Sequence, residues 1–276
     1  MIRILYTLLY YLLSPLMCVR WFIKSLRPPQ YREPFRQRFG FVTFEQTFDI
    51  WIHAVSVGET SGAISLINRL LANQADLKIL VTTTTPTGAK LLHESVGHKV
   101  SHCYSPCDLP GTIKRFIGRI KPKLVIIMET ELWPNWINYI SSKKTPIILA
   151  NARLSETSKQ KYLWFSQTSG WMLNQIQQIL AVNEADAKRF EQLGVDKKRL
   201  KVVGNLKFDA EFSCNGDGYF SHWTSSDYIW IAASTHQGED EIILQAHQQL
   251  LQQVASAKLV LVPRHPERFQ SVEKRF

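Results

Sequence analysis

Three acidic residues and one lysine lie where they could take part in acid–base chemistry, because each follows a short apolar run. Glu59 ends the segment HAVSVGE, Glu129 and Glu131 lie in METELWPN, and Lys207 lies in GNLKFD. A carboxylate at the start of a helix is stabilised by the helix dipole and can accept a proton from a hydroxyl group. A lysine can neutralise a carboxylate or a phosphate. The four residues are therefore candidates for proton transfer beside an anionic group.

Each of the four also has an ordinary structural explanation. Glu59 stands where an apolar run breaks, and an acid at or just before a helix start commonly caps that helix. Glu129 and Glu131 precede a Trp-Pro pair and could be solvated surface acids. A lone surface lysine such as Lys207 is usually inert. Residue type alone leaves both explanations open.

A second group of residues could bind an anionic nucleotide. Ser234 and Thr235 lie in ASTHQGED at an expected helix start, and Arg264 lies in VPRHPERF. Hydroxyl groups at a helix N-terminus and arginine side chains bind phosphate. His265 more often caps or packs than catalyses. The hydroxyl-rich turn TTTTPTG, residues 82–88, is compatible with a phosphate or a sugar but is unspecific.

Several motifs of other enzymes are missing from the sequence. It has no Walker loop, no G-x-G-x-x-G after a strand and no H-E-x-x-H, which argues against an ATPase, a dinucleotide enzyme and a metalloprotease. The cysteines provide no zinc motif and no disulfide framework, which favours a reducing compartment. They are Cys18, Cys103, Cys107 and Cys214.

The elements that must position these residues follow an alternating pattern. Short apolar runs alternate with amphipathic stretches, which predicts βα units in a parallel sheet covered on both faces. Ligands of such sheets bind at the carboxyl ends of the strands, where the candidate residues lie. The expected strands are 49–55, 77–83, 123–128, 145–151, 178–183 and 199–205, and the expected helices are 62–71, 87–94, 135–141, 155–173 and 184–193.

The pattern predicts two domains of unequal completeness. Residues 28–212 form an expected Rossmann-like domain, and the Gly/Ser/Asp-rich stretch 213–227 suits a linker. Residues 228–276 begin a second domain of the same type, with strands at 228–234 and 257–262 and a helix at 239–253. Two strands and one helix cannot close a core. We therefore expect this second domain to be incomplete.

The first 27 residues are expected to form a membrane anchor helix. Residues 4–23 are almost wholly apolar and roughly long enough to cross a bilayer or lie deeply in it. No cleavage site follows. Only Arg3 precedes the run while many cations follow it, which places the rest of the chain in the cytoplasm. Pro15 and Arg20 leave open whether the segment spans the bilayer or lies in its interface. A buried first helix is the alternative.

Charge supports a membrane surface as a partner. Lys and Arg outnumber Asp and Glu by 33 to 23, which favours phosphates of lipid headgroups, nucleotide-sugars or nucleic acid. The cations do not interleave with aromatic residues on one later face, so nucleic acid is not expected. Six of them lie at the end of the apolar run or after it and form a basic collar suited to anionic lipid. They are Arg20, Lys24, Arg27, Arg32, Arg36 and Arg38.

Seven segments in order carry a resemblance to a known family. HAVSVGE, TTTTPTG, METELWPN, NARLS, GNLKFD, ASTHQGED and VPRHPERF resemble the 3-deoxy-D-manno-octulosonic acid (Kdo) transferases of Gram-negative bacteria. The resemblance implies an α/β fold of GT-B type with an N-terminal anchor. It implies an inverting enzyme that needs no metal and no cofactor and moves Kdo from CMP-Kdo to the lipid A precursor, lipid IVA. Its implied location is the cytoplasmic face of the inner membrane.

The same resemblance suggests a role for each candidate residue. Glu59 matches the proton acceptor, while Glu129 and Lys207 match positions that stabilise the transition state, with Glu131 as the reserve acid. Lys207 and Arg264 would balance the Kdo carboxylate and the departing phosphate. The donor-binding set is Pro263 and Arg264, which match part of the family's CMP site, together with Ser234 and Thr235.

The sequence departs from the family after VPRHPERF. Family members continue through further βα units and a glycine-rich GGHN-type segment that completes the nucleotide pocket, and these are absent from the 276 residues. We therefore expect a C-terminally truncated member. The alternatives are a membrane-bound remnant that only binds the lipid acceptor, or another GT-B enzyme such as a lipid-A-disaccharide synthase or a nucleotide-sugar epimerase.

Overall fold

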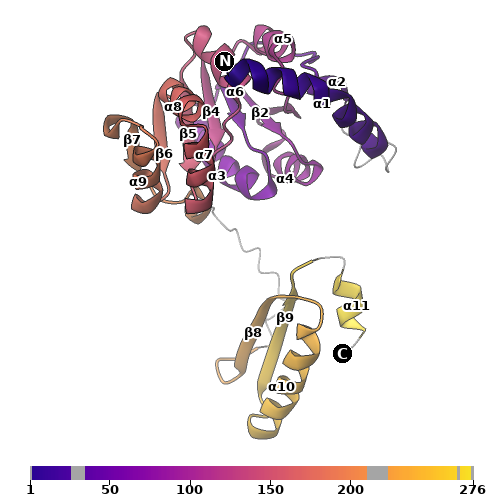
Figure 1. Ribbon diagram of the computed structural model, residues 1–276. Helices are drawn as coiled ribbons and strands as arrows, with labels where there is room; N and C mark the ends of the chain where they lie inside the picture. Colours follow the sequence, from indigo (N-terminus) through magenta and orange to yellow (C-terminus); the bar gives the residue numbers. More distant parts are fainter. Residues whose placement is uncertain (1, 26–34, 210–222, 266–267, 275–276) are drawn as a thin grey trace. The chain divides into compact units, whose positions relative to one another are not determined.

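The structure is a computed structural model that describes residues 2–25, 35–209, 223–265 and 268–274. The chain forms two compact units, Met1–Glu211 and Phe212–Phe276 (Figure 1). Part of the basic collar (Arg27 and Arg32), Cys214 and residues 213–222 of the expected linker lie outside the described residues.

A seven-stranded parallel sheet forms the centre of the first unit, in the order β3-β2-β1-β4-β5-β6-β7. Every residue of β1 (Ile50–His53) and of β2 (Ile79–Thr83) is buried. Continuous buried runs are typical of a parallel sheet with helices on both faces, so the expected α/β class is confirmed. The remaining strands are β3 (Ser101–Tyr104), β4 (Leu124–Met128), β5 (Ile147–Ala152), β6 (Gln178–Ala181) and β7 (Leu200–Val202).

Helices cover the two faces of the sheet and form two separate cores. Neighbouring residues of β1 divide between them, since Trp51 belongs to one core and Ile52 to the other. The Ile52 core includes α3 (Val57–Asn73) and α4 (Pro86–Val96). The Trp51 core includes α5 (Pro110–Ile120), α6 (Pro134–Ser142), α8 (Ser166–Gln175) and α9 (Glu184–Gln192).

Two parts of this unit differ from the expectation. Strand β3 and helix α5 were not expected from the sequence. The strand SHCY is short and begins with polar residues, so it lacks the apolar run that marks the other strands. The single helix expected over 155–173 is wrong, since this stretch forms α7 (Glu156–Trp164) and α8. The backbone of Phe165 between them leaves the helical region, with φ −116° and ψ 39°.

The first helix, α1 (Ile2–Ser25), has one packed face and one exposed face. On the packed face the Thr7 hydroxyl donates to Oδ1 of Asn135 at 3.1 Å, and Tyr6 and Tyr10 are half-buried. None of the described helices combines the length and apolarity that crossing a membrane requires. The exposed face of α1 is apolar and includes Ile4, Leu5, Leu8, Leu9, Leu12, Leu16 and Val19.

The expectation that Arg38 belongs to a lipid-facing basic collar is wrong. Arg38, at the end of α2 (Phe35–Arg38), is only 4% exposed and cannot face a lipid headgroup. Its guanidinium donates to the carbonyl oxygens of Thr84 and Ser105, in the loops that follow β2 and β3. Arg36 is exposed, as a lipid-facing cation requires.

The second unit contains two parallel strands, β8 (Tyr228–Thr235) and β9 (Ala257–Pro263). Helix α10 (Glu239–Gln253) connects them, and the short helix α11 (Phe269–Glu273) follows β9 (Figure 1). The strands and helix expected from the sequence are confirmed here within a residue or so.

Candidate active site

Glu59 is built into the first turn of α3. Ser56 is the N-cap residue, and its hydroxyl accepts the backbone N–H of Glu59 at 3.3 Å. In return one oxygen of the Glu59 carboxylate accepts the Ser56 N–H at 3.2 Å and its hydroxyl at 2.9 Å, and the other accepts the Val55 N–H at 2.8 Å. This reciprocal pair is a capping box, which supplies the first turn with acceptors for its free N–H groups.

Capping does not use the whole carboxylate of Glu59. A carboxylate offers about four lone-pair positions, and three donors reach this one, two at Oε1 and one at Oε2. Among the residues that the structure describes, no donor occupies the second position on Oε2. Burial raises the pKa of Glu59 and the Glu129 carboxylate raises it further, while the three hydrogen bonds oppose this shift. A base with a raised pKa accepts a proton more readily at neutral pH.

Glu129 and Lys207 meet although they follow different strands. Glu129 comes directly after β4 with φ +54°, and its N–H donates to the Ala150 carbonyl at 2.8 Å. Its Oε1 lies 3.8 Å from Nζ of Lys207. Lys207 belongs to a 3-10 turn, η3 (Leu206–Asp209), that follows β7. The structure thus brings together two of the residues expected from the sequence.

The Lys207 amine also lies over the start of α3. A Cβ placed on Gly58 would stand 3.0 Å from Nζ of Lys207, so the absent side chain leaves room for the ammonium group. Gly58 is the neighbour of Glu59, which brings the lysine to the same helix start as the candidate base. The Lys207 ammonium therefore lies near the Glu129 carboxylate and near Gly58, the residue before Glu59.

Glu131 belongs to the same group of acids. Burial raises its pKa, and the carboxylates of Glu59 and Glu129 raise it further. Its charge also acts on Tyr162 in α7: burial and then the Glu131 carboxylate raise the pKa of that hydroxyl to about 12. The Glu59, Glu129 and Glu131 carboxylates thus lie close enough to influence one another at the carboxyl edge of the sheet.

Asn151, the first residue of the segment NARLS, had no role assigned from the sequence, but it belongs to this region. It lies in β5 beside the end of β4, has φ +53° and is 1% exposed. Its Oδ1 accepts the backbone N–H of Leu206 at 3.1 Å, immediately before Lys207. The signal that could have revealed it is an asparagine at a strand end, because asparagine tolerates this left-handed backbone better than most residues.

The hydroxyl-rich turn 82–88 is largely occupied by structural bonds. The Thr82 hydroxyl, which is buried, bonds to the indole N–H of Trp51 and to the His53 ring. Thr85 is the N-cap of α4 and accepts the Gly88 N–H at 3.1 Å. Burial lowers the pKa of His53 to about 3, so its ring is neutral at physiological pH.

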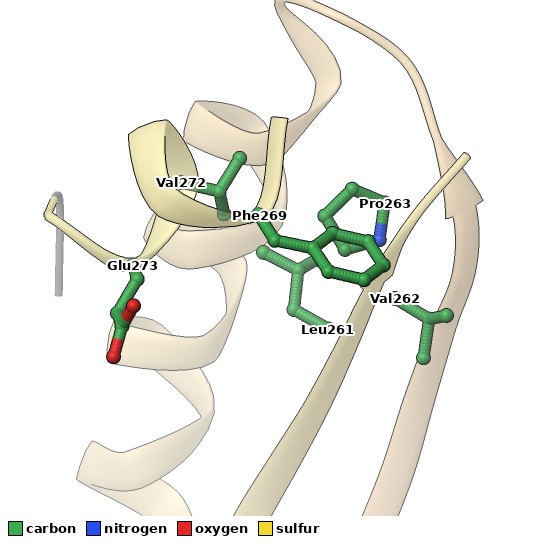
Figure 2. A pocket seen from close by; sticks show the side chains of 6 residues that line it. All are labelled: Leu261, Val262, Pro263, Phe269, Val272 and Glu273. Carbon is green, nitrogen blue, oxygen red and sulfur yellow. The ribbon is translucent and has the colours of Figure 1, made fainter. Parts of the chain in front are cut away.

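The donor-binding candidates lie in the second unit. Ser234 has φ +62°, and the Thr235 hydroxyl is buried and donates to Asp240 at 2.8 Å. The backbone N–H of Arg264 donates to the Thr235 carbonyl at 3.0 Å, which joins the loops after β8 and β9. Pro263 lines an apolar pocket whose volume is about 350 Å³. Figure 2 shows the six side chains around it. Its lining is Leu261, Val262, Pro263, Phe269, Val272 and Glu273.

Within the described ranges, no three His, Cys, Asp or Glu side chains are grouped closely enough to hold a metal ion.

Comparison with known proteins gives matches over most of the chain. Residues 33–210 match the family described as 3-deoxy-D-manno-octulosonic-acid transferase (kdotransferase). The chain is 41% identical over 277 residues to the 3-deoxy-D-manno-octulosonic acid transferase of Haemophilus influenzae, covering 98% of this chain and 65% of that protein. It is 33% identical to a probable mitochondrial 3-deoxy-D-manno-octulosonic acid transferase of Arabidopsis thaliana, covering 97% and 62%. The chain therefore spans less than two thirds of these relatives.

Solved structures resemble the fold at low identity. UDP-GlcNAc 2-epimerase of Neisseria meningitidis, bound to UDP-GlcNAc, matches with a TM-score of 0.58 and 12% identity, covering 82% of this chain and 68% of that one. Another UDP-N-acetylglucosamine 2-epimerase matches with a TM-score of 0.56 and 14% identity, covering 83% and 65%. This likeness concerns the fold alone, and it confirms the expected GT-B type.

Proposed function

The chain belongs to the Kdo transferase family, and from this premise we propose that it transfers Kdo from CMP-Kdo to a hydroxyl group of a lipid A precursor, lipid IVA, in lipopolysaccharide synthesis. The observation that carries the proposal is the meeting of Glu59, Glu129 and Lys207 at one edge of the sheet. An acid whose pKa is raised, next to a cation, suits proton removal from a hydroxyl group beside an anionic sugar.

Glu59 is the proton acceptor in this proposal. The acceptor oxygen attacks the anomeric carbon of Kdo, its proton passes to the open position on Oε2 of Glu59, and the bond from that carbon to the phosphate oxygen breaks. CMP leaves with the electron pair of this bond. The attacking and leaving groups lie on opposite faces of the sugar, so the configuration inverts. The capping box supports the role, because it fixes the carboxylate against rotation.

Lys207 and Glu129 stabilise charge during this step. The Lys207 ammonium would balance the carboxylate that Kdo carries beside its anomeric carbon. Glu129, 3.8 Å away, keeps the ammonium oriented over the start of α3. Glu131 is the reserve acid. Since burial and then the neighbouring carboxylates raise its pKa, it can hold a proton that Glu59 has lost.

The second unit supplies part of the donor site in this proposal. Arg264 pairs with the CMP phosphate, and Pro263 and Ser234 shape the loops around the nucleotide. The bond between the Arg264 N–H and the Thr235 carbonyl supports this arrangement, because it holds the two loops together. The Thr235 hydroxyl, which donates to Asp240, would contribute through loop shape rather than through direct contact.

Helix α1 delivers the protein to its lipid acceptor by lying in the interface of the cytoplasmic face of the inner membrane. Its exposed apolar face and the exposed Arg36 that follows suit such a position. Its polar side is engaged by Asn135, which lies in the segment that also carries Glu129 and Glu131. The helix and the acids therefore adjoin loops at the same carboxyl edge of the sheet.

The test is a transfer assay with the purified protein, CMP-Kdo and lipid IVA in mixed micelles. The expected result is release of CMP together with a lipid whose mass has grown by one Kdo residue, and loss of both in Glu59→Gln. A folded sample that binds lipid IVA but releases no CMP would support the binding-only alternative. A parallel assay supplies UDP-N-acetylglucosamine alone, and its epimerisation without any Kdo transfer in the first assay would support the epimerase alternative.

A further inference from the structure

The segment that carries Lys207 crosses back over the sheet. It leaves β7 at the edge of the sheet and reaches α3, whose helix follows the more central strand β1. On arrival η3 packs against α3, where Leu206 joins the core that includes Met128. A lysine on such a crossing has no strand of its own to fix it. Its position depends on what holds the crossing down.

Asn151 is placed beneath this crossing. It lies in β5, between β4 and β6 in the sheet, and its Oδ1 accepts the Leu206 N–H at 3.1 Å. The orientation of the amide follows from this bond, because an N–H can only donate to the oxygen. A second amide acts one residue later, where Oδ1 of Asn205 accepts the Lys207 N–H at 3.1 Å. The two bonds fix consecutive backbone nitrogens of the turn.

The Asn151 side chain destabilises the fold in two ways, and packing does not explain why it is present. It is 1% exposed, and in the described part of the chain its Nδ2 has no hydrogen-bond partner. A buried donor without an acceptor destabilises a fold. The backbone at φ +53° is also unfavourable for most side chains. Glycine would relieve both problems, so the benefit of asparagine lies in its oxygen.

We propose that Asn151 is a positioning residue, which holds the turn η3 through the Leu206 N–H and so keeps the Lys207 ammonium between Glu129 and the start of α3. Its consequence for catalysis rests on the proposed transferase function, whereas its hold on the turn does not. The bond of 3.1 Å to Leu206 and the 3.8 Å approach of Lys207 to Glu129 are successive links of one arrangement.

Three substitutions at position 151 separate backbone from side chain. Asn151→Gly accepts the left-handed backbone but loses the oxygen, and Asn151→Ala loses both. Asn151→Asp keeps an oxygen for the Leu206 N–H and tolerates the same φ. Asn183→Ala is the matched control, because Asn183 follows the neighbouring strand β6 and its Oδ1 accepts the backbone N–H of Asp186, at 2.9 Å, in the first turn of α9.

Hydrogen exchange of residues 203–209, followed by mass spectrometry, is the first measurement. The proposal expects faster exchange in the Gly and Ala variants, and exchange near the wild-type rate in the Asp variant and the control. The second is steady-state transfer, where the Gly and Ala variants should lose kcat by on the order of 10- to 100-fold at little changed KM, the scale that small misplacements cause. The Asp variant should have a higher kcat than the Gly and Ala variants.

The two measurements keep the proposals apart. Wild-type exchange in Asn151→Gly would overturn the positioning role, whether or not transfer is detected. Faster exchange in a protein without any transfer would keep the positioning role and remove the proposed function. A double variant with Lys207→Ala should be no slower than Lys207→Ala alone, and an additive loss would show that Asn151 acts by another route.

Discussion

Nζ of Lys207 lies 3.8 Å from Oε1 of Glu129, and the same amine occupies the space that a side chain at Gly58 would fill. The ammonium group is thereby held between a residue that follows β4 and the first turn of α3. The Lys207 and Glu129 side chains are 36% and 28% exposed, so water screens much of their attraction. This pair contributes little to folding, and its expected value lies in the chemistry.

Replacement of Lys207 by methionine should therefore separate activity from stability. We expect transfer to fall by on the order of 10²- to 10³-fold, the usual effect of removing one stabilising charge from a transition state. The free energy of unfolding should change by less than about 1 kcal/mol, because the ion pair is partly exposed. Steady-state kinetics and urea denaturation measure the two effects.

Lys90→Met is the matched control for this replacement. Lys90 also lies 3.8 Å from a glutamate, Glu94, on the exposed surface of α4. Lys90→Met should leave both the transfer rate and the free energy of unfolding near the wild-type values. Equal losses of transfer in the two variants would mean that Lys207 acts only through the net charge of the protein.

Two replacements of Glu59 should separate its capping role from its role as a base. Glutamine at the third helical position still accepts the Val55 or Ser56 N–H, so Glu59→Gln should keep its stability but lose transfer by about 10²-fold or more. Glu59→Ala should lose transfer and also about 0.5–2 kcal/mol of stability, because the cap is gone. Transfer that survives in Glu59→Gln would remove Glu59 as the base.

The pH dependence of transfer should reflect the same carboxylate. Burial and the Glu129 charge raise the pKa of Glu59, so its basic form accumulates at a higher pH than for an exposed glutamate. The rate should therefore rise with pH along a limb that lies above the ordinary glutamate range of about 4.3. Glu129→Gln removes one raising charge and should move this limb to lower pH. A limb that stays in place would assign it to another group.

Much of the candidate site could be predicted from the sequence, because it depends on local rules. Glu59, Glu129 and Lys207 follow apolar runs, and the carboxyl ends of parallel strands meet at one edge. The spacing of Ser56 and Glu59 is that of a capping box, so even the bonds of Glu59 were within reach of local reasoning. Residue type and spacing did not decide between a structural and a functional role for each residue. The family resemblance favoured the functional role.

Asn151 and Arg38 could not be placed in this way, because their partners are distant in the chain. The acceptor that Asn151 offers to Leu206 exists only once β7 has joined the sheet and the chain has crossed back to α3. Arg38 follows a row of cations and looks like one more of them. Its burial depends on carbonyl oxygens of Thr84 and Ser105, which no local pattern reveals.

The exposed face of α1 should bind anionic vesicles. Leu16 is 67% exposed, so Leu16→Glu should remove an apolar contact worth about 1.5–3 kcal/mol and weaken binding by roughly 10-fold or more. Ile242→Glu is the matched control, because Ile242 in α10 is also 67% exposed. Sedimentation with phosphatidylglycerol vesicles measures both. Equal binding by the two variants would mean that α1 does not lie in the interface.

Asp108 should make the stability of the first unit depend on pH. Its carboxylate accepts the Asn135 and Trp136 N–H groups at the start of α6, at 3.1 and 2.8 Å. Burial outweighs these bonds and raises its pKa from 3.8 to about 6. The folded protein thus binds a proton that the unfolded chain releases between these values, so stability should fall as pH rises from about 4 to about 6 and then level off.

Asp108→Asn should remove this contribution. A rise of the pKa from 3.8 to about 6 corresponds to roughly 3 kcal/mol as an upper bound. Asp108 therefore lowers the unfolding free energy by up to that amount between pH 4 and pH 7, and the variant should lack this decrease. The comparison uses the slope of the unfolding free energy against pH. The asparagine side chain can accept only one of the two backbone N–H groups, so the variant is less stable at every pH. Urea denaturation at several pH values measures both slopes. Parallel slopes would mean that the environment of Asp108 leaves its proton affinity close to that of the unfolded chain.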